Sequence, residues 1–142
     1  MTYRPRICPF HVLMGHVPEG SSVLDIGCGS GGWLYFLSRF GKISKGVGVE
    51  VSPERIANAK SMKTEADNLE FAVIGLDEDW PDGEYDCVTM IDVLHHVPHV
   101  EQEDFIKRIK KLDVKKIVFK DIDPGARFKS FMNSLHDIVL AR

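Results

Sequence analysis

Val23-Leu24-Asp25-Ile26-Gly27-Cys28-Gly29-Ser30-Gly31-Gly32 is the stretch that decides the fold of this chain. An apolar run rich in β-branched residues enters a turn made almost wholly of glycine, and a helical pattern follows over Trp33–Phe40. Glycines allow a positive φ and let a ligand approach the main chain closely. A strand, a glycine turn and a helix in this order predict a site that cradles a nucleotide.

The spacing of the glycines does not decide which nucleotide binds. Gly27, Gly29 and Gly32 satisfy the G-x-G-x-x-G fingerprint of dinucleotide sites. Gly27, Gly29 and Gly31 satisfy the shorter G-x-G-x-G equally well. A P-loop is excluded, because no Gly-Lys-Ser/Thr follows the turn.

The charge of Asp25 discriminates better than the spacing. A dinucleotide would place its pyrophosphate over this turn, and no Lys or Arg lies between Ser21 and Tyr35 to offset the repulsion from the carboxylate. S-adenosylmethionine carries a sulfonium and an ammonium and no phosphate, so Asp25 favours it. The alternative role for Asp25 is a cap of the turn that ends the strand.

Length, composition and charge narrow the class of protein. The 142 residues are enough for one domain with a core of its own, 1–142, and the composition is that of an ordinary globular protein. The net charge of −3 gives no general attraction to nucleic acid, so we expect no nucleic-acid partner; a local basic patch is the alternative. Three widely spaced cysteines, Cys8, Cys28 and Cys87, indicate free thiols. With no membrane-length apolar run and no signal peptide, we expect a cytoplasmic protein without a membrane partner.

Strand and helix patterns alternate along the chain. Strands are predicted at 22–26, 45–51, 69–74, 85–91 and 114–122, and helices at 31–40, from 53, at 100–112 and from about 125 to the end. This alternation predicts a doubly wound α/β domain, Rossmann-like, with a mostly parallel sheet, strand order 3-2-1-4-5 and helices on both faces. Residues 1–20 are either a lid over the ligand or a segment that packs on the sheet.

The C-terminal segment has a clear helical period. Its apolar positions form one stripe: Phe128, Phe131, Met132, Leu135, Ile138 and Val139. That spacing predicts a last helix that continues to the end of the chain.

Glu50 closes the second predicted strand, shortly after the glycine turn. In doubly wound folds an acid at this point hydrogen-bonds the two hydroxyls of a ribose, and its alternative role is a solvated strand end. Ser52 and Pro53 then predict a helix N-terminus.

An acidic loop, 75–83, follows the third predicted strand. In such a place Asp77 can accept a hydrogen bond from the amino group of an adenine, while Leu76 or Trp80 covers a face of the ring. A solvated acidic loop is the alternative.

His95, His96 and His99 lie within five residues after the fourth predicted strand. We expect no metal there, because adjacent histidines point in different directions, Pro98 interrupts a helix, and no Cys or second acidic cluster completes a ligand set. His95 or His96 could face the acceptor as a base or orienting group, because imidazole titrates near neutral pH. A packed or solvent-facing imidazole is the alternative for each.

Three segments together resemble class I S-adenosylmethionine-dependent methyltransferases. The segment 23–31 is similar to the first motif of that family, 48–52 to the second, and 85–88 with 93–97 to the fourth. The resemblance covers about 21–122, and the combination is more specific than any single motif.

The resemblance implies a cofactor, S-adenosyl-L-methionine, with S-adenosyl-L-homocysteine as product, and a set of residues that hold it. Asp25, Gly27 and Gly29 would bind the methionine part, and Cys28 and Gly31 of the same motif would also belong to the cofactor site. Glu50 would bind the ribose and Val51 an adenine face, and Asp92 or Val93 would lie near the methyl group.

Two departures from the family pattern stand out. Many members carry a Gly-Asp pair after the third strand, whose Asp binds the adenine amino group, whereas here Leu76 follows Gly75 and Asp77 comes one place later. The family also adds an antiparallel hairpin after the last helix, for which this sequence has no room. The strand at 114–120 would then be a bare edge with apolar side chains on both faces, so we expect a homodimer that covers this edge or the last helix. The alternative is a truncated or minimal form of the domain.

These observations favour a methyltransferase acting on a small-molecule acceptor. No Asn/Asp-Pro-Pro-Tyr/Phe segment follows the fourth strand, which disfavours amino groups of DNA bases or glutamine. The alternative is an S-adenosylmethionine-binding module that is non-catalytic or depends on a partner. A NAD-binding domain is a third possibility, disfavoured by Asp25.

Overall fold

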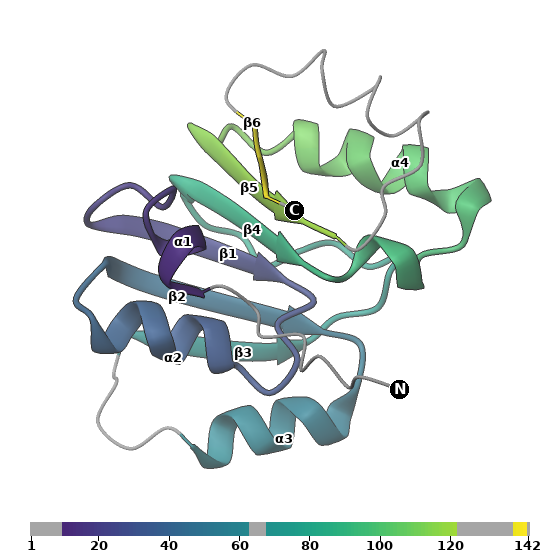
Figure 1. The fold of residues 1–142 in the computed structure, drawn as a ribbon. Coiled ribbons are helices and arrows are strands. Elements are labelled where there is room, and N and C mark those ends of the chain that lie inside the picture. Colours follow the sequence, from purple (N-terminus) through teal and green to yellow (C-terminus); the bar gives the residue numbers. More distant parts are fainter. Residues whose placement is uncertain (1–9, 63–67, 122–137, 142) are drawn as a thin grey trace, which may run out of the picture.

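A parallel sheet of six strands forms the centre of the computed structural model, which describes residues 10–62, 68–121 and 138–141 (Figure 1). Its order is β3-β2-β1-β4-β5-β6, and every pair of neighbours is parallel. The strands are β1 (Ser21–Ile26), β2 (Ile43–Glu50), β3 (Leu69–Val73), β4 (Cys87–Ile91), β5 (Lys116–Lys120) and β6 (Ile138–Ala141). The predicted doubly wound α/β class and the order 3-2-1-4-5 are confirmed, and β6 extends the sheet beside β5.

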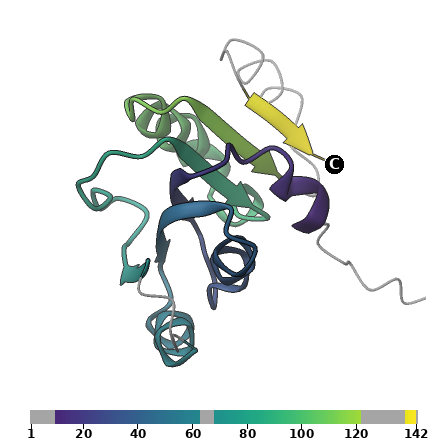
Figure 2. The ribbon, with the colours of Figure 1, turned by 90° about the vertical axis from the view of Figure 1, so that its left-hand side faces the viewer.

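Helices cover both faces of the sheet, as predicted (Figures 1 and 2). One face carries α1 (Phe10–Met14), α2 (Gly32–Arg39) and α3 (Pro53–Ser61), and the other carries α4 (His99–Lys110), which follows a short 3-10 turn, η1 (Leu94–His96). No helix within the described ranges is long and apolar enough to cross a membrane.

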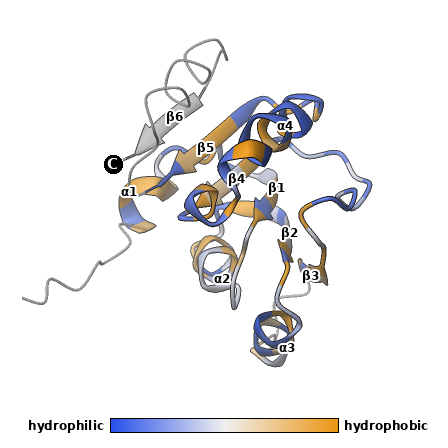
Figure 3. Ribbon diagram, turned by 90° about the vertical axis from the view of Figure 1, so that its right-hand side faces the viewer, coloured by the Kyte–Doolittle hydropathy of each residue, from blue (hydrophilic) through white to orange (hydrophobic). Residues whose placement is uncertain are grey.

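Along each central strand, successive side chains point to opposite faces of the sheet. On β1, Val23 packs with α1, α2 and α3, whereas Leu24 packs with α4. Both are fully buried, so apart from Asp25 the strand is apolar toward both faces from Val23 to Ile26. The helices turn their apolar sides to the sheet (Figure 3).

The segment before β1 packs on the sheet through α1 and the turn after it. Leu13 and Val17 are buried in the same apolar cluster as Leu34 and Leu37 of α2. The helix α2 ends at Arg39, one residue before the predicted end at Phe40, and Phe40 is 60% exposed.

The C-terminal prediction is wrong where the structure describes it. Ile138 and Val139 lie in β6 rather than in a helix, and they pair with Ile117 and Val118 of β5. The other four residues of the predicted stripe, at 128, 131, 132 and 135, lie outside the described residues.

The prediction of an uncovered β5 edge is therefore also wrong. Backbone N–H and C=O groups of an edge strand are open to pairing with another chain, but here β6 of the same chain takes them. The homodimer predicted through this edge loses its basis, and the predicted last helix, its other surface, is not described.

Candidate functional site

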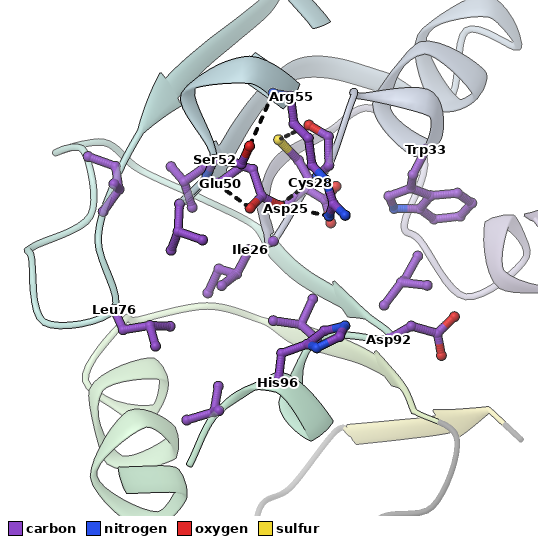
Figure 4. Close-up of a pocket in the computed structure, with 18 of the residues that line it drawn as sticks. Asp25, Ile26, Cys28, Trp33, Glu50, Ser52, Arg55, Leu76, Asp92 and His96 are labelled. Carbon is purple, nitrogen blue, oxygen red and sulfur yellow. Dashed lines mark hydrogen bonds and ion pairs between the residues drawn. The ribbon is translucent and has the colours of Figure 1, made fainter. Parts of the chain in front are cut away.

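A pocket of about 720 Å³ opens at the carboxyl ends of β1, β2 and β4 (Figure 4). This is the switch point of the sheet, where chain connections leave in opposite directions and ligands of open α/β folds bind. Ten of the residues singled out in the sequence line it: Asp25, Gly27, Cys28, Gly29, Glu50, Val51, Leu76, Asp92, Val93 and His96. Gly31, Asp77 and His95 do not.

The glycines of the turn after β1 differ in what they do. A Cβ on Gly27 would lie 2.3 Å from Cγ2 of Val93, so this glycine lets the turn pack against the segment after β4. Gly29, at φ 56°, has no atom within 4 Å of its Cβ position, and this open space belongs to the pocket. Gly31 is structural, because a Cβ there would collide with the ring of Phe71.

Asp25 is a buried acid at the base of the pocket, with only 3% of its surface exposed. Its Oδ1 accepts a hydrogen bond of 2.7 Å from Oγ1 of Thr89, its register partner on β4. Burial raises the pKa of Asp25 to about 7, the Thr89 hydrogen bond opposes that rise, and the charge of Glu50 adds to it.

Thr89 and Trp33 were not predicted as site residues. Nε1 of Trp33, in the first turn of α2, donates to Oγ1 of Thr89 over 3.2 Å. The sequence offered one signal, a lone hydroxyl side chain among the apolar residues of β4. It gave no means of linking that hydroxyl to Asp25, which lies 64 residues earlier.

Both carboxylate oxygens of Glu50 accept hydrogen bonds from backbone N–H groups. Oε2 accepts from the N–H of Gly29 at 3.1 Å, and Oε1 accepts from the N–H of Ser52 at 3.1 Å. Arg55, in the first turn of α3, lies 4.0 Å from Oε2. Ser52 is the predicted N-cap of α3, and its Oγ accepts from the N–H of Arg55. The end of β2 and the start of α3 thus fix this carboxylate against the glycine turn (Figure 4).

The loop after β3 forms another wall of the pocket. Leu76 and Trp80 line it, whereas Asp77 lines an adjoining hollow of about 520 Å³ beside α4, which shares Leu76 with the pocket. Arg108 of α4 donates to the carbonyl oxygens of Leu76 and Glu78 and lies over the ring of Trp80, 4.6 Å from its centroid. Arg108 therefore fastens this loop to α4, a function that the sequence did not indicate.

The two predicted histidines both belong to the turn η1, and their side chains have different partners. His96 lines the pocket (Figure 4). Nδ1 of His95 lies instead 2.9 Å from Oδ1 of Asp121, and the backbone N–H of His95 donates to Oδ2 of the same carboxylate. The two imidazoles contact each other, with their ring centroids 3.9 Å apart.

Asp92 follows β4 with a φ of 55°, and no other non-glycine residue among those described has a positive φ. Nζ of Lys120 donates to both carboxylate oxygens of Asp92, at 2.6 and 2.8 Å. The backbone N–H of Asp92 also donates to the carbonyl oxygen of Lys120. A left-handed non-glycine residue costs about 1–3 kcal/mol and persists where its surroundings hold it. Asp92 and Lys120 thus fix the chain where it enters the pocket wall.

Trp33 borders the pocket on the side away from Leu76 (Figure 4), and it belongs to an aromatic cluster. The ring of Phe10 from α1 lies 5.1 Å from that of Trp33 and 5.4 Å from that of Phe36. Phe10 and Trp33 both line the pocket, so the N-terminal segment contributes to it as well as packing on the sheet.

The pocket contains one thiol, that of Cys28. Cys28 is a free thiol, and burial together with the charges of Asp25 and Glu50 raises its pKa, which keeps it protonated. In the ranges that the structure describes, no group of three or more His, Cys, Asp or Glu side chains is arranged to hold a metal ion.

Comparison with known proteins gives the family. A model of the methyltransferase domain matches residues 3–125. The ubiquinone biosynthesis O-methyltransferase of Acinetobacter baylyi is 31% identical over 81 residues, which are 56% of this chain and 34% of that protein. The chain thus spans about a third of the length of this curated relative.

Solved structures that are similar to this chain include methyltransferases. The DhpI-SAM-HEP complex is 27% identical, with a TM-score of 0.64, over 84% of this chain and 54% of that one. A complex between the Haloferax volcanii Trm112 methyltransferase activator and a methyltransferase contains a chain that is 30% identical, with a TM-score of 0.58, over 70% of this chain and 44% of that one. Because the family model covers most of the sequence, the chain belongs to the methyltransferase domain family.

Proposed function

We propose that this chain binds S-adenosylmethionine in the pocket and transfers its methyl group to a hydroxyl of a small aromatic acceptor. One observation carries the proposal: two buried carboxylates, Asp25 and Glu50, flank an open glycine turn in one pocket of a methyltransferase-domain protein. The DhpI complex, by its name, contains the same cofactor.

The charges that line the pocket suit this cofactor better than a dinucleotide. Two of the carboxylates that line it, those of Asp25 and Glu50, flank the glycine turn, and the guanidinium of Arg55 also lines it. The third carboxylate, Asp92, is paired with Lys120. Arg55 lies beside Glu50, and the glycine turn itself carries no basic residue. A pyrophosphate over this turn would face carboxylates without a compensating cation, whereas an ammonium or sulfonium group would be attracted.

Each part of the cofactor has a candidate partner. Asp25 would bind the ammonium group through Oδ2, since Thr89 uses Oδ1. Glu50 would accept from the ribose hydroxyls, for which a carboxylate held by two N–H groups still has acceptor capacity. Val51 and Leu76 offer apolar faces for the adenine. Asp77 lines the other hollow, so we do not assign it the adenine amino group.

The aromatic end of the pocket supports an aromatic acceptor. Phe10 and Trp33 line that end, and an acceptor ring would pack against them. The relative from Acinetobacter baylyi is named as an O-methyltransferase of ubiquinone biosynthesis, which supports oxygen as the acceptor atom.

His96 is our candidate for receiving the acceptor's proton. The bound cofactor supplies an electrophilic methyl group, and transfer requires mainly alignment and removal of one proton. His96 lines the pocket, and the turn that carries it is held by Asp121 through His95. His95 thus has a positioning role in this proposal rather than a catalytic one.

Calorimetric titration of the protein with S-adenosylhomocysteine and with NAD tests the cofactor. We expect binding of the former, at least tenfold weaker for Glu50→Gln, since hydrogen bonds to a charged group contribute about 1.5–3 kcal/mol. Glu54→Gln, on the adjoining exposed turn of α3, is the matched control and should bind as the parent does. Preference for NAD, or unchanged affinity in Glu50→Gln, would overturn the assignment.

A second candidate is a binding module that becomes active only with a partner. The Haloferax volcanii chain, 30% identical to this one, was solved with a methyltransferase activator. Methylation of catechol acceptors by the isolated chain would exclude this candidate. Binding of S-adenosylhomocysteine without turnover of catechol, thiol or amine acceptors would favour it.

A further inference from the structure

We infer that Trp33 and Thr89 form a directional hydrogen-bond relay that keeps the Asp25 carboxylate ionised and aimed at the ammonium group of the cofactor. Both would be positioning residues for cofactor binding, because they act through Asp25 and not by touching the ammonium themselves. The inference rests on the proposed function, in which Asp25 receives that group.

The relay joins three elements in the core of the molecule. Trp33 belongs to α2, Thr89 to β4 and Asp25 to β1. The two hydrogen bonds measure 3.2 Å from Nε1 of Trp33 to Oγ1 of Thr89 and 2.7 Å from that oxygen to Oδ1 of Asp25. All three residues are buried, and Thr89 has no exposed surface. Water therefore does not compete for these hydrogen bonds at Thr89.

The direction of the relay follows from the chemistry of its first member. An indole N–H donates and never accepts, so the Thr89 oxygen is an acceptor toward Trp33. The single hydroxyl hydrogen of Thr89 is then left for Asp25. A donor aimed at a buried carboxylate favours the ionised form over the protonated one. A phenylalanine at position 33 would pack similarly but would leave the hydroxyl of Thr89 free to turn.

The surroundings of Asp25 show why this contact matters. Glu50 from β2 and the thiols of Cys28 and Cys87 are its charged or titratable neighbours in the core, and none of them favours its negative charge. The pocket also holds the ionisable residues Arg55, Asp92 and His96. Burial and Glu50 both raise the pKa of Asp25, the hydrogen bond from Thr89 opposes that rise, and the net result is a pKa of about 7.

This balance links cofactor binding to a proton near neutral pH. The ammonium group binds the ionised carboxylate, so affinity should fall about tenfold for each pH unit below about 7. Loss of the Thr89 hydroxyl would raise the pKa of Asp25 further, and the whole binding profile would move to higher pH.

The test is calorimetric titration of the full chain between pH 6 and 9 with two probes. S-adenosylhomocysteine carries the ammonium group, and methylthioadenosine shares the nucleoside but lacks that group. Thr89→Val removes the hydroxyl with little change of shape, Thr89→Ser retains it, and Trp33→Phe removes the indole donor. Circular dichroism selects the variants that are folded, and Thr89→Ser with Trp33→Phe still tests the relay if Thr89→Val does not fold.

We expect Thr89→Val to bind S-adenosylhomocysteine about tenfold more weakly at pH 6, which corresponds to a shift of the profile by about one pH unit. Trp33→Phe should move the profile the same way by less, Thr89→Ser should restore it, and the affinity for methylthioadenosine should not change. Equal weakening of both probes without a shifted profile would show that Thr89 serves packing only and would overturn the inference.

Asp25→Asn separates this inference from the proposed function on which it rests. Unchanged affinity for S-adenosylhomocysteine in Asp25→Asn would refute the proposed placement of the cofactor. Strong weakening in Asp25→Asn together with a parent-like profile in Thr89→Val would leave the placement standing and refute the relay alone.

Discussion

At the scale of single residues, Asp25 combines a binding role with a cost in stability. A carboxyl group with 3% exposure favours protonation, and its pKa in the folded protein is about 7 against an ordinary value of 3.8. Between these values the folded protein binds a proton that the unfolded chain has released. The free energy of unfolding therefore falls as pH rises from about 4 to about 7, and the lost contribution does not return at higher pH.

Asp25→Asn should consequently stabilise the protein without ligand at pH 8. A rise of about three pKa units corresponds to about 4 kcal/mol, an upper bound on the gain. Urea denaturation at pH 5 and pH 8 measures it, and the gain should be smaller at pH 5, where Asp25 is already protonated. A gain of equal size at both pH values would contradict the linkage.

Asp86 provides a control of opposite sign. It is an acid whose pKa is lowered, first by the hydrogen bond from the N–H of Ser22 and then by Lys115. Its ionised form is the one that folding favours, so stability from this group is present above its unfolded pKa and lost as pH falls. Asp86→Asn should lower the melting temperature at pH 8, whereas Asp25→Asn should raise it.

At the scale of elements, the glycine turn between β1 and α2 combines packing and binding. Gly27 makes room for Val93, and Gly29 leaves room for a ligand. The same backbone turn thus needs glycine at neighbouring positions for different physical reasons.

Gly29→Ala isolates the binding part. Gly29 and Gly20 both have positive φ values, 56° and 71°, and at neither residue does any atom lie within 4 Å of the position that a Cβ would take. Each alanine should cost about 1–2 kcal/mol of stability from the left-handed backbone alone. Only Gly29→Ala should weaken S-adenosylhomocysteine binding, about tenfold or more, since a methyl placed where a ligand packs costs about 1–3 kcal/mol. Equal affinity in the two variants, by calorimetry, would argue against a ligand over Gly29.

Arg108 tests a second element, the loop 75–83. Its guanidinium holds two loop carbonyls and lies over Trp80, so Arg108→Ala should release the loop from α4. We expect faster amide hydrogen exchange across 75–83 and a several-fold weaker affinity for S-adenosylhomocysteine. Lys107→Ala, which removes an exposed ion pair with Glu103 worth about 0.3–0.5 kcal/mol, is the control. Exchange in the loop that is equally fast in both variants would contradict the role of Arg108.

At the scale of the whole molecule, the sheet is extended within the chain rather than by another copy. Strand β6 pairs with β5 over four residue pairs, from Ile117 with Ile138 to Lys120 with Ala141. The apolar side chains of β5 are buried, Val118 and Phe119 among them. A β5 strand without β6 would therefore expose a backbone edge beside an apolar core.

Removal of residues 138–142 should make the protein associate. The backbone groups of β5 that β6 satisfies would be free to pair with another chain. Size-exclusion chromatography with light scattering, at several protein concentrations, would show a larger mass for the shortened chain than for the full chain. A shortened chain that stays monomeric at all concentrations would show that the β5 edge needs no cover.

Much of this architecture was predictable because its signals are local. The alternation of apolar strands with amphipathic helices predicts the order of the central strands, since parallel connections follow a fixed hand. The Ser52–Pro53 start of α3 was confirmed for the same reason: capping depends on neighbouring residues. The helical stripe at the C-terminus misled at Ile138 and Val139, because pairing with β5 outweighs local periodicity there.

What the sequence by itself determined is the fold class, the family and the chemical character of the glycine turn, because each depends on residues close together in the chain. Only the tertiary structure shows which side chains lie together at the pocket. It joined Trp33 and Thr89 to Asp25, placed His96 rather than His95 in the pocket, and kept Asp77 out of it. The physical reason is that hydrogen bonds and burial act through space: the partners of Asp25 and His95 lie 64 and 26 residues away, and no local pattern selects them.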